Sequence, residues 1–142
     1  MTLTQAQSHF DAYADAFSRR DMGAIAAMWR FPCFISDQNG GAGFRDAEAF
    51  RRNLDRLSGF YDAQGVAHAD ARVQTATTDF DGVAQVRVDY RLADAHGQTI
   101  IAWPTDYVLR RGEDGAWKAC FAIADGEVAA WAERGTPLGA KN

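Results

Sequence analysis

Hydrophobic positions in the first part of the chain recur every three or four residues, which is the period of amphipathic helices. Thr4 followed by Gln7 is typical of a capping box, so we expect the first helix over Thr4–Arg20. Its apolar stripe consists of Ala6, Phe10, Tyr13, Ala14 and Phe17. The stripe predicts a helix with one side in the core.

A second, shorter helix follows the first. Asp21 can cap it, and Pro32 is expected to stop it. Its apolar residues are Met22, Ile25, Ala26 and Trp29. A strand over Cys33–Asp37 comes next and leads into the glycine-rich turn at Asn39-Gly40-Gly41.

A third helix is predicted after Asp46, which is placed to cap it, and Gly59 is expected to end it. The buried stripe comprises Phe50, Leu54 and Leu57. The opposite side carries Arg51, Arg52, Asp55 and Arg56, which we interpret as a solvated face.

Beyond Gly59 the hydrophobic period changes to two, as expected for strands. The predicted strands are Ala69–Thr78, Val83–Ala93, Gln98–Arg111 and Ala116–Asp125. Turn signals such as Asp81-Gly82 separate them, and nothing resembles a linker. The pattern therefore predicts one α+β domain over residues 1–142, with helices packed on a largely antiparallel sheet.

The turns set which strand residues share a face. Asp94–Gly97 and Glu113–Gly115 fit three-residue hairpin loops that end in a left-handed glycine. That register places Val86 opposite Asp106 and Asp106 opposite Ala122. The face turned to the helices is then Val86, Val88, Tyr90, Ile100, Ala102, Pro104, Asp106, Val108, Cys120, Ala122 and Ala124.

The reverse face of this sheet is largely aromatic in the same register. Its large residues are Trp103, Tyr107, Leu109, Trp117, Phe121 and Ile123. Monomers rarely expose so large an apolar patch, so we expect a homodimer through the outer sheet face, with the row Gln85, Arg87, Asp89 and Arg91 as its rim. The alternative is that the tail, Glu127–Asn142, covers the patch through Val128 and Trp131.

Composition narrows the functional classes. The chain is 47% hydrophobic and 24% charged, with a formal net charge of −4, which argues against nucleic-acid or anionic-membrane binding. No apolar run is long enough to span a bilayer, and no signal peptide is visible. Cys33 and Cys120 are interpreted as reduced core residues, with a single bridge as the alternative. We therefore expect a cytoplasmic protein.

Tyr13, Asp37 and Asp106 are polar residues at positions where apolar ones are expected. Tyr13 is commonly a core ring whose hydroxyl has a partner, and Asp37 commonly a turn residue. Asp106 lies in mid-strand, where an Asp is rare unless it is paired or functional. The three histidines show no ligand spacing, so no metal or cofactor is expected.

The segment YADAFSRRDMGAIAAMW, residues 13–29, resembles the opening of the nuclear transport factor 2-like superfamily. Pro104-Thr105-Asp106 resembles a Pro-x-Asp motif of the ketosteroid isomerases in that superfamily, which also contains the SnoaL-like polyketide cyclases. The resemblance implies three N-terminal helices packed on a curved antiparallel or mixed sheet that encloses a cone-shaped pocket.

The resemblance also implies a site and a reaction. Asp37 would be the catalytic base, with Tyr13 and a protonated Asp106 as donors to a carbonyl oxygen. The pocket would be lined by Phe17, Trp29, Ile35, Val86, Val88, Tyr90, Pro104, Val108, Cys120, Ala122 and Ala124. This favours an isomerase, dehydratase or cyclase that acts on a small apolar carbonyl compound. A non-catalytic module that binds a hydrophobic metabolite and an assembly domain are the alternatives.

Overall fold

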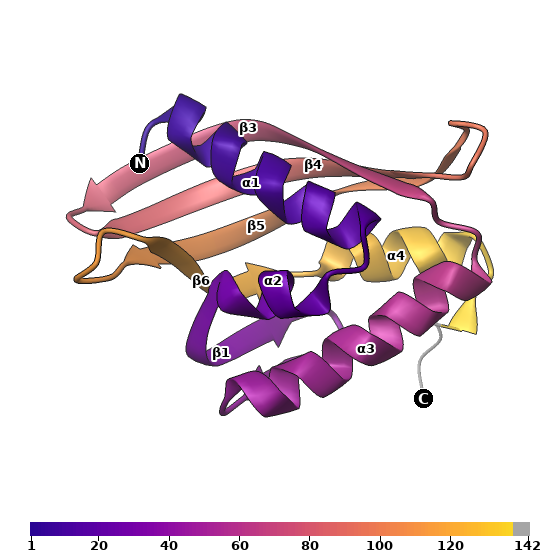
Figure 1. Ribbon diagram of the computed structural model, residues 1–142, viewed down its shortest axis with the longest axis horizontal. Coiled ribbons are helices and arrows are strands. Elements are labelled where there is room, and N and C mark those ends of the chain that lie inside the picture. Colours follow the sequence, from indigo (N-terminus) through magenta and orange to yellow (C-terminus); the bar gives the residue numbers. More distant parts are fainter. Residues whose placement is uncertain (138–142) are drawn as a thin grey trace.

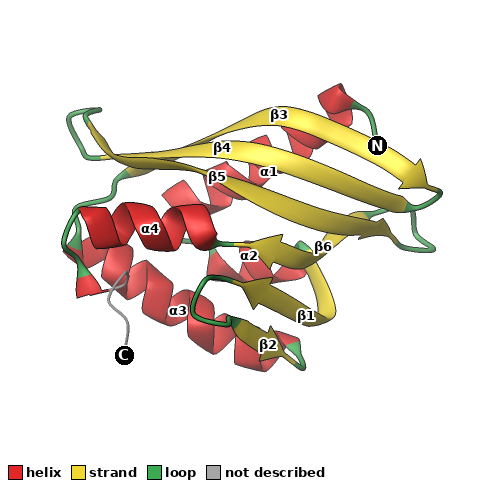
Figure 2. Cartoon of the chain, turned by 180° about the vertical axis from the view of Figure 1, so that it is seen from behind, coloured by secondary structure: helices red, strands yellow, loops and turns green. Residues whose placement is uncertain are grey.

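Helices cover one side of a curved six-stranded sheet in the computed structural model, which describes residues 1–137 (Figure 1). The elements are α1 (Leu3–Ser18), α2 (Met22–Ala27), β1 (Trp29–Ser36), β2 (Ala42–Phe44), α3 (Ala47–Ala63), β3 (His68–Phe80), β4 (Val83–Ala93), β5 (Thr99–Arg111), β6 (Trp117–Ile123) and α4 (Asp125–Glu133). The strand order is β2-β1-β6-β5-β4-β3 (Figure 2). Strands β1 and β6 pair in parallel and the other neighbours pair antiparallel, so the predicted curved, mixed α+β architecture is confirmed.

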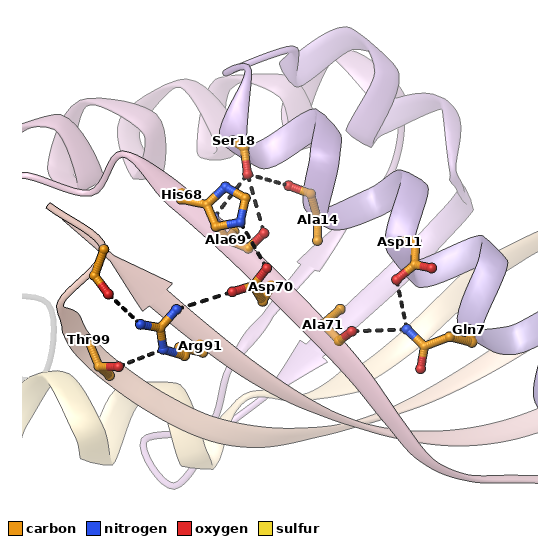
Figure 3. Close-up of polar contacts among 11 residues, drawn as sticks. Gln7, Asp11, Ala14, Ser18, His68, Ala69, Asp70, Ala71, Arg91 and Thr99 are labelled. Atoms are coloured by element: carbon orange, nitrogen blue, oxygen red, sulfur yellow. Dashed lines mark hydrogen bonds and ion pairs between the residues drawn. The ribbon is translucent and has the colours of Figure 1, made fainter. Parts of the chain in front are cut away.

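Polar side chains of helix α1 form hydrogen bonds with the backbone of β3 (Figure 3). The Gln7 amide donates to the Ala71 carbonyl (2.9 Å) and accepts from the Val73 N–H (2.8 Å). Ser18 accepts from the Ala69 N–H at 2.9 Å. The prediction that Gln7 belongs to a capping box is therefore wrong. The capping box is instead formed by Thr2 and Gln5.

The second helix is shorter than predicted, although Asp21 does cap it by accepting from the Ala24 N–H. Trp29 begins β1 instead of ending the helix, and Pro32 lies inside that strand. Pro32 has no N–H to donate, and the β1–β6 register shifts between Trp29 and Phe34. This segment is therefore an irregular strand that pairs with β6.

The third helix continues past Gly59, where the sequence predicts its end. A mid-helix glycine costs about 1 kcal/mol relative to alanine. Burying Tyr61, which is 3% exposed, offsets that cost, since a large side chain gains about 1.5–3 kcal/mol on burial. Asp46 caps the helix as predicted.

Bulges change the strand register that the hairpin turns establish. Ala93 pairs with Thr99, but Leu92 pairs with Ile101, so Ile100 is an extra residue in β5. Cys120 is likewise extra in β6, between the pairs Leu109–Ala119 and Val108–Phe121. The Ile100 bulge reverses the faces of β5 relative to β4. The Cys120 bulge restores the predicted faces of β6 for residues 121–123 only, and Trp117 and Ala119, which precede it, face the other way.

The reversal of β5 corrects the predicted faces. Trp103, Tyr107 and Leu109 are buried on the helix side, while Pro104, Asp106 and Val108 face outward. The outer patch predicted for a dimer thus loses four of its six members, because Trp117 also lies on the core side, with Ala119. Phe121 and Ile123 remain on the outside.

The last predicted strand ends at Ile123, and the chain continues as α4. Trp131 on this helix is fully buried, with its ring 4.9 Å from that of Phe60 on α3. The predicted tail therefore packs between β5 and α3 and not over the outer face, as far as residue 137. Residues 138–142 of that prediction lie outside the described part of the chain.

Candidate functional site

Aromatic side chains from α1, α3 and the sheet enclose a cavity of about 100 Å³, which we call the inner cavity. Residues predicted for the pocket that line it are Tyr13, Phe17, Trp29, Ile35, Tyr90, Ala122 and Ala124. Tyr61, Trp103, Thr105 and Tyr107 add polar atoms to an otherwise apolar wall.

Hydrogen bonds orient the hydroxyl groups of the inner cavity. Tyr13 accepts from the Trp29 indole N–H at 3.0 Å, and the hydroxyls of Tyr90 and Tyr107 are 2.7 Å apart. Each of the three hydroxyl oxygens takes part in one of these two bonds. The Tyr90–Tyr107 bond uses one tyrosine hydroxyl proton, whereas the bond to Tyr13 uses the indole proton of Trp29. The cluster therefore has hydroxyl protons to donate to a ligand oxygen.

Burial raises the pKa of Tyr13, and it raises the pKa of Tyr90 and of Tyr107 well above the ordinary value. All three side chains consequently stay neutral at physiological pH. Neutral phenols are hydrogen-bond donors, which is the form needed to stabilise negative charge on a carbonyl oxygen.

Glu127 is the carboxylate of the inner cavity. It lies in the first turn of α4 and accepts from the Tyr61 hydroxyl (2.5 Å) and the Trp131 indole N–H (3.1 Å), both at Oε2. Burial raises the pKa of Glu127, while the two donors act in the opposite direction. A carboxyl group with a raised pKa in an apolar cavity is suited to exchange protons with a bound molecule.

A wider outer pocket of about 500 Å³ lies beside the inner cavity. The two share the lining residues Ile35, Asn53, Leu57 and Glu127. Glu127 is therefore at the junction, where a ligand entering from the outer pocket reaches the tyrosines.

Asp37 lines the outer pocket and does not line the inner cavity. Its Oδ1 accepts from the Asn39 backbone N–H at 2.7 Å, the turn role that its position after a strand suggested. Tyr13 thus lines the inner cavity and Asp37 lines the adjoining outer pocket, while Glu127 lines both.

Asp106 is on the opposite face of the sheet from the cavity, so its predicted place in the pocket is wrong. It forms a bidentate ion pair with Arg87, at 2.9 and 3.0 Å. The Ile100 bulge explains the error, because one extra residue turns Asp106 outward and Tyr107 inward.

The remaining predicted pocket residues do not line the cavity. Pro104 and Val108 face outward with Asp106, and Cys120 is the bulge residue of β6. Val86 and Val88 are buried in the core without lining the inner cavity.

Glu127 and Tyr61 were missed, although each has a signal in the sequence. Tyr61 extends the stripe Phe50, Leu54, Leu57 at helical spacing, past Gly59, at which the sequence predicts the end of the helix. Glu127 precedes Trp131 by four residues, which places both on one face of a helix. Only the packing of α4 on α3 shows that this face is turned to the cavity.

Among residues 1–137, no helix is long and apolar enough to span a membrane. That same part of the chain has no cluster of three or more His, Cys, Asp or Glu residues able to hold a metal ion. The site is thus described by its aromatic rings, hydroxyl groups and one carboxylate.

Solved structures with this fold come from several bacteria. Aln2 from a Streptomyces species is 14% identical with a TM-score of 0.69, and each chain covers 94% of the other. A ketosteroid isomerase-like protein from Erwinia carotovora atroseptica is 19% identical with a TM-score of 0.61, over 82% of this chain and 88% of that one. A candidate aromatic ring hydroxylase from Novosphingobium aromaticivorans is 17% identical with a TM-score of 0.60, over 85% of each chain. At these identities the similarity shows a common fold.

No curated protein matches the chain. A family model described as NTF2-like protein (DUF6841) matches residues 4–127, a range that runs from α1 to Glu127 in the first turn of α4. The superfamily resemblance read from the N-terminal segment is thereby confirmed, and the chain belongs to this NTF2-like family.

Proposed function

We propose that this protein is a small-molecule enzyme that removes a proton next to a carbonyl group in an aromatic pocket. Glu127 carries the proposal, because it is a carboxyl group with a raised pKa at the entrance to a cavity lined by tyrosine hydroxyls. Such a step can begin an isomerisation, a dehydration or a cyclisation of a carbonyl compound.

Glu127 is the proposed general base. It takes the proton from the carbon next to the carbonyl, and the C–H electrons form a carbon–carbon double bond as charge moves to the carbonyl oxygen. The hydroxyl of Tyr13, held by Trp29, donates to that oxygen. The protonated Glu127 then returns the proton to the same or another carbon, which completes an exchange or an isomerisation.

Asp37, the base expected from the sequence, is the second carboxylate near the site. Its position in the outer pocket and its bond to the Asn39 N–H favour a role in the turn. We therefore assign the base to Glu127.

Deuterium exchange tests the proposal. Monocyclic ketones and enones are incubated with protein in D₂O, and loss of the proton signal next to the carbonyl is followed by NMR. Glu127→Gln should slow exchange by about 10²–10⁴-fold, the usual contribution of a general base. Asp106→Asn, on the outer face, is the matched control and should exchange like wild type. Equal exchange by wild type and Glu127→Gln would contradict the assignment. Binding without exchange by wild type would favour a metabolite-binding module.

We also propose that the protein forms a homodimer and is located in the cytoplasm. Two exposed apolar residues of the outer face, Phe34 and Ile123, support contact with a second copy of the chain. The half-buried Phe121 lies beside them, with its ring stacked on that of Phe34 at 6.3 Å. The two free cysteines support a reducing compartment.

A further inference from the structure

The outer pocket has one cationic side chain in its lining, Arg56 of α3. On the same helix, Arg51 pairs with Asp55 and Arg52 pairs with Glu48, each one turn away at 3.2 Å. Arg56 has Arg52 and Phe60 at the corresponding positions. Within residues 1–137 it has no ion-pair partner within 4.0 Å.

The Arg56 guanidinium retains donors for a ligand. Its side chain donates to Asn53 Oδ1 at 3.2 Å, and Asn53 lines both the outer pocket and the inner cavity. A guanidinium is always charged and has five N–H donors, in a planar fork that matches a carboxylate or phosphate. Arg56 thus has N–H donors available to an anionic group in the outer pocket.

The two carboxylates that also line the outer pocket already have donors. Asp37 accepts from the Asn39 N–H, and Glu127 accepts from Tyr61 and Trp131. Ile35, Phe44, Leu57 and Phe60 make much of the remaining wall apolar. A ligand that satisfies this pocket combines apolar surface with one anionic group.

The size of the inner cavity limits the apolar part of the ligand. An apolar cavity of about 150 Å³ holds benzene in an engineered protein. The inner cavity, at about 100 Å³, therefore has room for no more than about one ring, and the rest of a larger ligand must extend into the outer pocket.

We propose that the substrate is a monocyclic ketone or enone with an anionic side chain, whose ring enters the inner cavity and whose anion binds Arg56. This inference rests on the proposed function for the position of the carbonyl group beside Glu127. It adds the charge and the size of the substrate and assigns Arg56 as the residue that selects an anionic compound.

Binding of a matched pair of probes tests the inference independently of turnover. The probes are 4-oxo-4-phenylbutanoate and its methyl ester, followed by titration calorimetry. Wild type should bind the acid about tenfold or more tightly than the ester, the range expected for a charged hydrogen bond. Arg56→Gln should remove this preference and leave ester affinity unchanged. Arg52→Gln, on the solvated face of the same helix, should keep it.

The outcomes separate the inference from the proposed function. If wild type binds acid and ester equally, or Arg56→Gln keeps the preference, Arg56 does not select the anion and the inference is overturned. If neither probe binds wild type, both the inference and the proposed pocket fail. If the acid preference is present but no proton exchange occurs, the inference stands and the catalytic proposal fails.

Discussion

The Tyr61 hydroxyl donates a 2.5 Å hydrogen bond to Glu127 Oε2, joining α3 to α4 at the entrance of the inner cavity. The bond stabilises the ionised carboxylate and so lowers the pKa of Glu127 against the effect of burial. Tyr61 therefore controls the pH range in which Glu127 can accept a proton.

Tyr61→Phe should raise the pKa of Glu127 further, because burial then acts with one opposing donor fewer. The rising limb of the pH–rate profile should move to higher pH, and so should the titration of the Glu127 side-chain carboxyl observed by ¹³C NMR. Tyr90→Phe removes a hydroxyl from the same cavity without a bond to Glu127, so it should leave that titration unchanged. An unshifted titration in Tyr61→Phe would show that this bond does not control Glu127.

Glu127 should also make stability depend on pH. Its usual pKa is 4.5, and burial raises the pKa in the folded state. The folded state therefore binds more protons than the unfolded state between these two values, and the free energy of unfolding falls as pH rises through that window. Glu127→Gln should lack this decrease in urea unfolding at a series of pH values from 4.5 upward. Parallel pH profiles for wild type and variant would contradict burial of the carboxyl group.

Trp131 should be a principal support of α4, because its side chain is fully buried against Phe60. Replacing a buried tryptophan by alanine costs about 3–5 kcal/mol. Trp131→Ala should lower the urea midpoint accordingly, and Trp131→Phe should lose less because most of the ring contact remains. A loss below about 1 kcal/mol for the alanine variant would mean that α4 contributes little to the fold.

The Arg87–Asp106 ion pair should contribute little to stability, since both side chains are substantially exposed. In a double-mutant cycle, Arg87→Gln and Asp106→Asn should have nearly additive effects on the free energy of unfolding measured in urea. Asp106→Asn should leave the affinity for 4-oxo-4-phenylbutanoate unchanged. A large loss of affinity would place Asp106 at the site instead.

Self-association through the outer face should depend on Phe121, which stacks on the exposed Phe34. Light scattering at micromolar concentrations should give the mass of a dimer for wild type and of a monomer for Phe121→Glu. Leu3→Glu, at another exposed apolar position, is the control and should stay dimeric. A monomeric wild type would contradict the dimer.

Local signals in the sequence were sufficient to predict most helices and strands of the fold. Caps at Asp21 and Asp46 are formed by each residue with its near neighbours, so a short stretch of sequence contains the information. The glycine turns are local as well, and Gly97 and Gly115 adopt the left-handed conformation that the hairpin loops required. Tyr13 was identified for the same reason, because it lies in a helical stripe.

The faces of β5 and the identity of the buried carboxylate depended on contacts between distant segments. A bulge at Ile100 or Cys120 has no local signature, since it depends on how the strands pack against the helices. The one-residue shift at Ile100 turns Asp106 away from the pocket and turns Trp103 and Tyr107 toward it. Glu127 became a site residue only because Trp131 anchors α4 against α3, which turns that carboxylate toward tyrosines far away in the chain.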